Sequence, residues 1–371
     1  MSKRDIKLSQ TRLSDTTSKY LEKLLRANQN GEDYPVVQDF EAKICEYIGV
    51  PYGCALISGT AALHLGFQVL GVQKGDTVLC SSFTFAASAF PITYLAAKPI
   101  FIDVEIDTWN LCPVLLEQAI TSEISKGQKP KAIVVVHSYG VPAQMDAIVQ
   151  VSKKYQIPVL EDAAEALGAT YNGKPVGAFG DLAVFSFNAN KVVSTLGGGM
   201  LVGKNRTLLD KAKYLATQAK LDTPHYEHTE IGYNYSMSPL AAAVGMAQLE
   251  LLQSEIQKRK AVFEYYQNEL KNYKEIQFLD GNKTTVSNGW LTCIQTPSFA
   301  FREQLRLRLK KEGIESRPLW KPMHQQPVFA NETAYVNGNS DALFEKGLCL
   351  PSSAHLSEQE LKRVIGCVKN N

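Results

Sequence analysis

Short apolar runs alternate with amphipathic segments between about residue 53 and residue 203. The runs have the length of buried strands: Cys54–Ile57, Thr77–Cys80, Ile100–Val104, Ala132–Val136, Pro158–Leu160, Leu182–Phe185 and Met200–Val202. This alternation is typical of an α/β domain with a mostly parallel sheet that is covered on both faces. Because ligands bind at the carboxyl ends of such strands, residues far apart in sequence are expected to meet at one edge.

The C-terminal third follows a different pattern. A helical pattern begins at Pro239 and continues to about residue 270, and we expect it to connect to a second domain. Beyond it the sequence predicts short strands and helices: Gln277–Leu279, Trp290–Ile294, Phe301–Lys311 and Gln359–Val368. We therefore expect a large domain over residues 1–250, including an N-terminal segment, and a small α+β domain over 251–371.

Composition and charge narrow the possible partners. The chain has 371 residues, and 39 Lys and Arg against 37 Asp and Glu give a net charge of +2, which provides no long-range field for nucleic acid or membrane. The chain shows neither an N-terminal signal core nor an apolar stretch long enough for a bilayer. Seven cysteines are scattered singly, which argues against a disulfide framework or a zinc site. We expect a cytoplasmic protein without a metal.

Two residues that follow or end apolar runs suggest the chemistry. Lys191 is the last residue of the segment 186–191, which follows the apolar run Leu182–Phe185. Asp162 lies at the end of the strand that begins with the run Pro158–Leu160. Pyridoxal phosphate needs an amine to hold its aldehyde and an anion to keep its ring nitrogen protonated. Glu165 lies one helical turn after Asp162, so it can face the same ligand near the ring hydroxyl. The alternative is an exposed turn at Asp162 and a solvated helix charge at Glu165.

Two further segments fit the same ligand. Gly59 and Thr60 open a helix after an apolar run, where free N–H groups bind phosphate, although Ser58 also fits an ordinary N-cap. Phe85 follows the run Thr77–Cys80 and could stack on a flat heterocycle, or it could belong to the core. The glycine run 197–199 precedes an apolar run, and neither G-x-G-x-x-G before a helix nor a P-loop occurs, so a nucleotide-binding fingerprint is lacking.

Four segments together resemble the DegT/DnrJ/EryC1/StrS family of pyridoxal phosphate-dependent sugar aminotransferases. They are Ser-Gly-Thr-Ala-Ala-Leu (58–63), Ser-Phe-Thr-Phe-Ala-Ala-Ser (82–88), Glu-Asp-Ala-Ala-Glu-Ala-Leu-Gly-Ala (161–169) and Ser-Phe-Asn-Ala-Asn-Lys with the glycine run (186–199). The similarity continues through residues 225–235 and 317–324, so it covers nearly the whole chain.

The resemblance implies the aspartate aminotransferase-like fold type I and a homodimer with composite active sites. Its implied cofactor residues are Gly59, Thr60, Phe85, Asp162, Glu165, Ser186, Asn188, Lys191 and Asn234. Among them, Lys191 resembles the lysine that holds the cofactor covalently, and Asn234 the asparagine that reaches the phosphate of the partner subunit. Ser236 stands where the family pattern Tyr-Asn-Tyr-Arg usually has arginine, so a charged contact to cofactor or substrate is lacking there.

The segment Arg-Pro-Leu-Trp-Lys-Pro-Met-His (317–324) resembles a subgroup that acts on nucleotide-linked 4-keto-6-deoxy sugars of the 2-acetamido series. This resemblance implies L-glutamate as donor, a UDP-linked sugar as acceptor, and a 4-amino sugar nucleotide for bacterial surface glycans. Arg317, Trp320 and His324 are the expected substrate contacts; the alternative places Trp320 in the small-domain core and His324 in a polar loop.

Other activities of the same fold stay open. They are amination at a C3 ketone, a sugar dehydratase that uses the cofactor without fixing it, and a non-catalytic regulatory protein that binds the cofactor. The dehydratase relatives resemble this chain but carry histidine at the position of Lys191, so the lysine argues against that activity.

Overall fold

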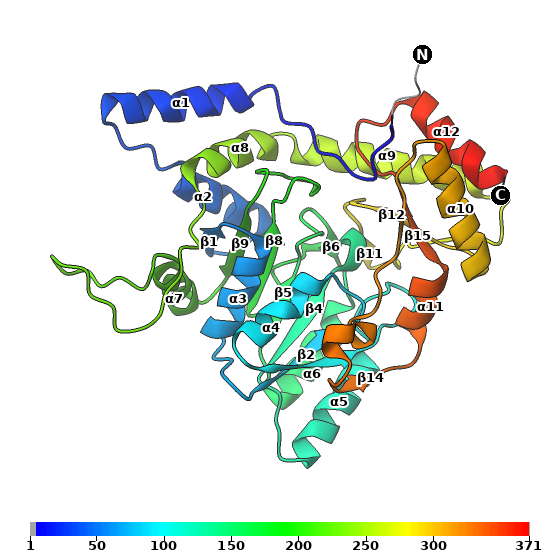
Figure 1. Cartoon of the computed structure of the whole chain (residues 1–371). Coiled ribbons are helices and arrows are strands. Elements are labelled where there is room, and N and C mark those ends of the chain that lie inside the picture. The colour runs from blue at the N-terminus through cyan, green and yellow to red at the C-terminus, as the bar shows by residue number, and fades with distance from the viewer. Residues whose placement is uncertain (1–4, 371) are drawn as a thin grey trace.

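The computed structural model describes residues 5–370 and is built around an eight-stranded sheet (Figure 1). The strands are β1 (Tyr52–Leu56), β2 (Thr77–Ser81), β3 (Lys98–Ile102), β4 (Ala132–Val136), β5 (Val159–Asp162), β8 (Leu182–Ser186), β9 (Gly199–Gly203) and β14 (Ala334–Tyr335). Their order is β1-β9-β8-β5-β4-β2-β3-β14, and β9 alone runs antiparallel to its neighbours. The prediction of a mostly parallel sheet is confirmed.

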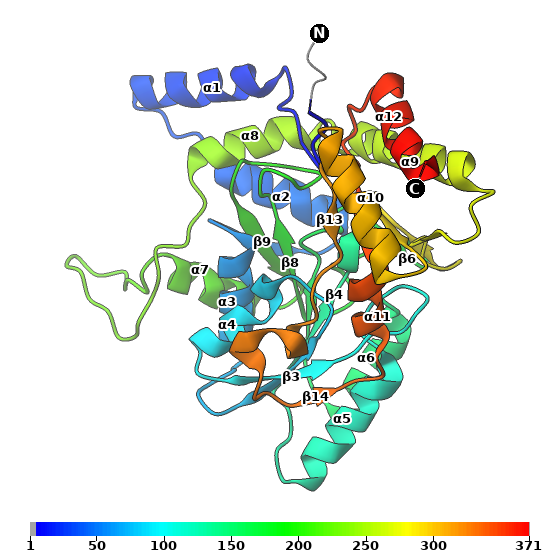
Figure 2. The same cartoon turned by 45° about the vertical axis from the view of Figure 1, so that its right-hand side comes forward.

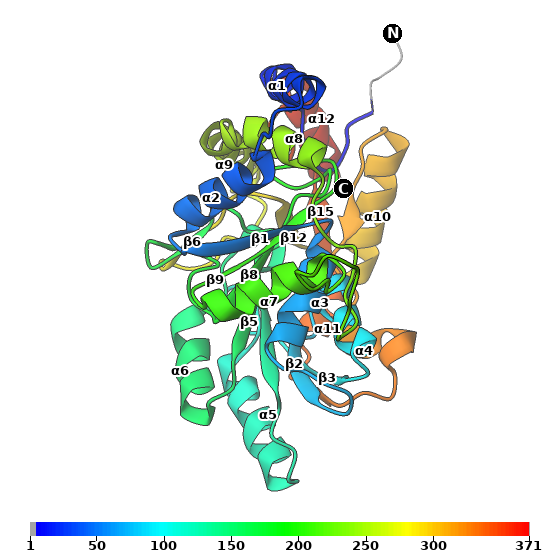
Figure 3. The ribbon, with the colours of Figure 1, turned by 90° about the vertical axis from the view of Figure 1, so that its left-hand side faces the viewer.

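Helices cover both faces of this sheet, as the opposite positions of α3 and α6 in Figure 3 show. One face carries α3 (Gly59–Val69), α4 (Phe90–Tyr94) and α7 (Arg206–Ala216), and the other α2 (Val36–Ile48), α5 (Pro113–Ser125) and α6 (Met145–Tyr155). Successive strand residues point to opposite faces, so Leu79 packs in one apolar cluster and Cys80 in the other. Since both faces are buried, the strands read as continuous apolar runs.

The long helix expected from Pro239 to about residue 270 is two helices, α8 (Pro239–Leu249) and α9 (Leu252–Leu270), so that prediction is wrong. The chain turns at residues 250–251, where Leu251 N donates to Gln248 O at 3.1 Å. The two halves have different packing partners. α8 contacts α1 (Thr17–Asn30) and α2, whereas α9 contacts α12 (Glu358–Lys369), which explains the change of direction.

A second sheet of four antiparallel strands forms the small C-terminal body, in the order β10-β12-β15-β13. Its elements are β10 (Gln277–Phe278), β12 (Thr292–Gln295), β13 (Arg317–Pro318), β15 (Gly347–Leu350), α10 (Phe299–Lys311) and α11 (Asn339–Lys346). Figure 2 shows α9, α10 and α12 grouped on one side of the molecule. This is the α+β region that the sequence predicts.

The chain crosses between the two bodies more than once. Ile6, near the start of the described residues, forms a β-bridge with Ile314, and β14 from the C-terminal part extends the large sheet beside β3. A third small sheet joins β6 (Thr170–Tyr171), β7 (Lys174–Pro175) and β11 (Thr285–Val286). The boundary between residues 250 and 251 stays a prediction. Within residues 5–370 no helix combines the length and apolarity needed to span a bilayer.

Candidate active site

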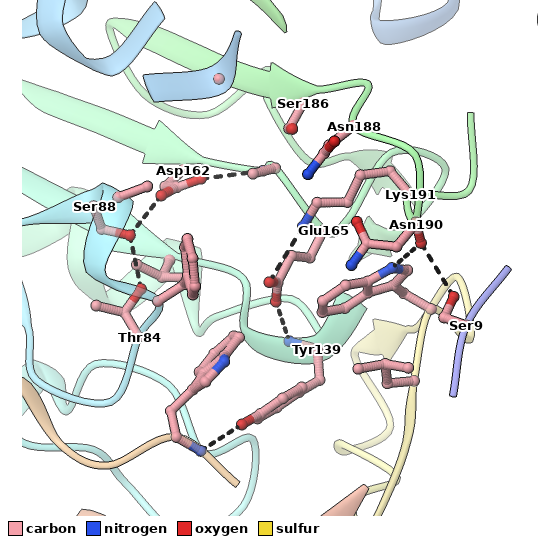
Figure 4. A pocket seen from close by; sticks show the side chains of 18 of the residues that line it. Ser9, Thr84, Ser88, Tyr139, Asp162, Glu165, Ser186, Asn188, Asn190 and Lys191 are labelled. Atoms are coloured by element: carbon pink, nitrogen blue, oxygen red, sulfur yellow. Dashed lines mark hydrogen bonds and ion pairs between the residues drawn. The ribbon is translucent and has the colours of Figure 1, made fainter. Parts of the chain in front are cut away.

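A cavity of about 640 Å³ opens beside the carboxyl ends of β5 and β8 and is bordered by the small body (Figure 4). It brings together ten residues that the sequence singles out: Gly59, Thr60, Phe85, Asp162, Glu165, Ser186, Asn188, Lys191, Arg317 and Trp320. Their individual roles stay predictions, but their convergence at one edge agrees with the expected position of the site.

Asp162 ends β5 and is 4% exposed, so the alternative of an exposed turn does not hold. Its Oδ2 accepts a hydrogen bond from Ser88 Oγ at 2.6 Å, and its Oδ1 accepts one from Ala164 N at 3.1 Å. Burial raises the pKa of Asp162, while these hydrogen bonds oppose the rise. A buried carboxylate of this kind needs a cation, which a protonated ring nitrogen would supply.

Ser88 is held in turn by Thr84, and sequence reasoning did not assign a role to either residue. The two hydroxyl oxygens lie 2.7 Å apart. Because Ser88 donates its proton to Asp162, Thr84 is the donor to Ser88. Both residues lie in the segment 82–88 that contributes Phe85, so the same loop that supplies the aromatic ring also fixes the orientation of the carboxylate.

Lys191 points into the cavity toward a second buried carboxylate (Figure 4). Its Nζ lies 3.4 Å from Glu165 Oε1 and 4.1 Å from the centre of the Trp290 ring. Glu165 Oε2 accepts a hydrogen bond from Tyr139 N at 2.9 Å. Burial raises the pKa of Glu165 to about 7, although the charge of Lys191 acts in the opposite direction. Glu165 is therefore no solvated helix charge and can hold or release a proton near neutral pH.

Side chains from distant parts of the chain hold the backbone at Lys191. Ser9 Oγ donates to Asn190 O at 3.1 Å, and Trp290 Nε1 donates to the same oxygen at 2.8 Å. Thr11 Oγ1 donates to Lys191 O at 2.5 Å. Sequence reasoning missed these contacts, since the polar N-terminal residues carry no local signal and Trp290 reads only as the start of a strand.

The N-terminus of α3 has the features of a phosphate site. Ser58 Oγ accepts from Ala61 N at 3.0 Å, so Ser58 is the N-cap that the alternative reading describes. Gly59 allows close packing: a Cβ there would lie 3.0 Å from Ser186 Cβ. Gly199 also allows close packing, because a Cβ at this position would lie 2.3 Å from the backbone carbon of Ser58. A helix N-terminus beside small residues and a hydroxyl fits the phosphate of the cofactor.

Phe85 is 61% exposed and lines the cavity, which contradicts its interpretation as a core residue. Its exposed ring therefore offers a flat apolar face at the cavity. An aromatic ring favours offset stacking on a second flat ring. The position therefore fits the predicted contact with the cofactor ring.

Trp320 lines the cavity and is also packed against the protein. It stacks on Tyr139 with ring centres 4.0 Å apart, and Trp320 N donates to the Tyr139 hydroxyl at 2.9 Å. Tyr139 has a φ of 56°, a left-handed conformation that is uncommon for a tyrosine. Arg317 also lines the cavity, where it pairs with Glu315 at 3.1 Å. These residues bring the small body to the edge of the site.

Two predicted contacts do not line the cavity. Asn234 is exposed, and its Oδ1 accepts from Gln218 Nε2 at 3.2 Å. His324 joins two segments instead: its Nδ1 lies 2.7 Å from Ser82 Oγ, and its Nε2 lies 3.1 Å from Asp341 Oδ1. This placement agrees with the alternative of a polar loop residue for His324. Among the described residues, no cluster of His, Cys, Asp or Glu is arranged to hold a metal ion.

Comparison with known proteins identifies the family. The model of the DegT/DnrJ/EryC1/StrS aminotransferase family matches residues 12–369. EpsN of Bacillus subtilis (strain 168), named as a pyridoxal phosphate-dependent aminotransferase, is 43% identical over 97% of this chain and 94% of its own length. GDP-perosamine synthase of Escherichia coli O157:H7 is 35% identical over 96% of this chain and 95% of its own length. UDP-4-amino-4,6-dideoxy-N-acetyl-beta-L-altrosamine transaminase of Campylobacter jejuni is 33% identical over 88% of this chain and 87% of its own length.

The solved structures agree with this assignment. Spr1654 of Streptococcus pneumoniae, named as a sugar aminotransferase and solved in its PLP form, superposes with a TM-score of 0.90 at 28% identity, covering 99% of this chain and 98% of that one. The expected fold type I is thereby confirmed, and the buried Asp162 and the small residues at the start of α3 fit the expected cofactor. The chain belongs to the DegT/DnrJ/EryC1/StrS aminotransferase family and is a pyridoxal phosphate-dependent sugar aminotransferase.

Proposed function

We propose that the protein transfers the amino group of L-glutamate to the C4 ketone of a nucleotide-linked 4-keto-6-deoxy sugar, with a UDP-linked 2-acetamido sugar as acceptor. The observation that carries this proposal is the convergence of Lys191, Glu165 and Asp162 in one cavity. The names of relatives support the sugar class, since one relative is named for a UDP-linked 4-amino-4,6-dideoxy sugar and another for a GDP-linked sugar. The product would be a 4-amino sugar nucleotide for a bacterial surface glycan.

Each residue has a defined task in this proposal. Pyridoxal phosphate, when bound, supplies the electron sink that makes the hydrogen next to the donor's nitrogen acidic. Asp162 provides the anion that faces the ring nitrogen, and Phe85 provides a stacking face. The Nζ of Lys191 carries the proton between donor and acceptor positions, as a general base and then a general acid. Glu165 and the Trp290 ring hold that nitrogen in place.

The test is a substrate panel. Purified protein with pyridoxal phosphate is given L-glutamate or L-aspartate as donor, and UDP- or GDP-linked sugars with a ketone at C4 or C3 as acceptor. We expect amination of the UDP-linked 4-keto sugar with glutamate, detected by product mass and by NMR assignment of the aminated carbon. Amination only at C3, or loss of water without amino transfer, would replace this proposal with one of the alternatives. An absence of turnover with every acceptor would refute the proposed substrate class.

The proposal includes a homodimer, and the exposed apolar side chains support it. The segment after α7 projects away from the body of the molecule in Figure 1 and carries Tyr226 and Ile231, which are 83% and 82% exposed. At the cavity, Ile57 is 54% exposed. A contact with a second chain would remove these apolar groups from water. In the dimer we place Asn234, which lies where this segment returns to the end of α7 and pairs with Thr217, at the phosphate of the partner subunit's cofactor.

A further inference from the structure

Two cysteine thiols lie next to each other on neighbouring strands of the small sheet. Cys293 lies in β12 and Cys349 in β15, and the two are directly opposite in the antiparallel register. Their sulfur atoms are 3.8 Å apart although 56 positions separate them in the sequence. The scattered spacing of the cysteines gives no sign of this pair, because strand pairing alone brings them together.

The position of the pair suits a disulfide. Residues that face each other in an antiparallel ladder have Cα atoms about 4.5 to 5.5 Å apart, which lies within the range of roughly 4.4 to 6.8 Å found for disulfides. The bond itself is about 2.05 Å long, so the sulfur atoms need to approach by less than about 2 Å. Side-chain rotation can supply that movement without a shift of the strands.

The two thiols differ in access. Cys349 lines the active-site cavity, whereas Cys293 is fully buried behind it. Burial raises the pKa of Cys293, which lowers its reactivity toward a reagent from solvent. Burial and the two neighbouring thiols also raise the pKa of the Tyr139 hydroxyl, the group that accepts the hydrogen bond from Trp320 N. The two thiols are therefore close enough to the Tyr139 hydroxyl to affect it, and Cys349 lines the same cavity as Tyr139 and Trp320.

We propose that Cys293 and Cys349 form a reversible disulfide when hydrogen peroxide enters the active-site cavity. Cys349 Sγ attacks the peroxide, the O–O bond breaks, and a sulfenic acid and water are formed. Cys293 Sγ then displaces the hydroxyl group from Cys349 Sγ, forming the S–S bond and a second water. The two thiols lose two electrons and two protons in total, and both oxygen atoms of hydrogen peroxide leave as water. A dithiol reductant reverses the bond.

The test uses the full-length protein with its cofactor bound. Protein is exposed to hydrogen peroxide, its remaining thiols are alkylated after denaturation, and peptides are mapped by mass under non-reducing conditions. We expect the number of free thiols to fall from seven to five per chain, with a peptide pair that joins Cys293 to Cys349 and that dithiothreitol separates. A ligand that fills the cavity, such as the product of the aminotransferase reaction, should slow the loss.

Cys112 provides the matched control, because it is partly exposed while the other cysteines are buried. Cys112→Ser should leave the Cys293–Cys349 peptide unchanged. Cys293→Ala should abolish the peptide, and Cys349 should then accumulate as sulfenic acid that a dimedone probe labels. The proposal is overturned if Cys293 and Cys349 both stay reduced in the folded wild-type protein while Cys112 is oxidised, or if they pair only after denaturation. The wild-type mapping decides the question even if a variant does not fold.

Discussion

Replacing Glu165 with glutamine should remove a large part of the pH dependence of folding stability in the cofactor-free protein. Burial raises the pKa of Glu165 from 4.5 to about 7, so the folded protein binds this proton more tightly than the unfolded chain does. Between those two values Glu165 binds more protons in the folded state than in the unfolded chain, so its contribution to stability falls as the pH rises. The stabilising effect of the proton is complete below about pH 4.5 and is lost by the time the pH has passed 7.

The size of the effect follows from the pKa shift. A shift of one unit corresponds to 1.36 kcal/mol, so the shift at Glu165 is worth about 3 kcal/mol between mildly acidic and mildly alkaline solution. Glutamine keeps the shape and can still accept the hydrogen bond from Tyr139 N, but it does not ionise. The variant should therefore be more stable than the wild type at pH 8 and nearly equal to it at pH 4.5.

Urea unfolding of the cofactor-free proteins at several pH values between 4.5 and 8.5 measures this difference. Glu275→Gln is the control, because it makes the same substitution at an exposed position away from the cavity. If the wild type and Glu165→Gln lose stability in parallel as the pH rises, Glu165 does not hold a proton near neutral pH. The role assigned to its burial would then be refuted.

Substitutions at three further positions test the site. Lys191→Ala and Lys191→Arg should bind the cofactor without a covalent bond and fail to complete a half-reaction, because neither side chain can form the bond or carry the proton; borohydride should fix cofactor only to the wild type, and normal turnover would contradict the assignment. Asp162→Asn should lower turnover on the order of 100-fold while cofactor occupancy changes little, which parallel activity and absorbance measurements check. Asn234→Ala mixed with Lys191→Ala should recover activity in a verified heterodimer; a clearly impaired Asn234→Ala homodimer with no recovery would place Asn234 in its own subunit.

Much of the site could be predicted because its parts lie at strand ends. Asp162 ends β5, Ser186 ends β8, and Gly59 opens α3 after β1, so a parallel sheet alone brings them to one edge. Local sequence is sufficient at these positions, since a short apolar run followed by a polar or small residue marks the edge. The family resemblance then assigned tasks to residues that the pattern had already placed.

The contacts that tertiary packing creates could not be predicted in the same way. Trp290 reaches Lys191 across about a hundred positions, and its role depends on how the small body packs against the sheet. The break at residues 250–251 depends on the separate partners of α8 and α9, which a continuous helical pattern cannot reveal. Tertiary packing also brings His324 to Ser82 and Asp341, whereas the motif around His324 had predicted a contact with the substrate.

The hydrogen bonds that hold Lys191 also constrain the order in which the protein can become active. Its loop depends on Ser9 and Thr11, which are synthesised before β1, and on Trp290, which is synthesised well after β9. The segment around Ser9 is itself fixed by residues near the far end of the chain, since Gln10 N donates to Ser353 Oγ. A nascent chain on the ribosome can form most of the large sheet before residue 353 has emerged. It cannot yet lock the lysine loop, so competence for catalysis is among the last properties that the newly made chain acquires.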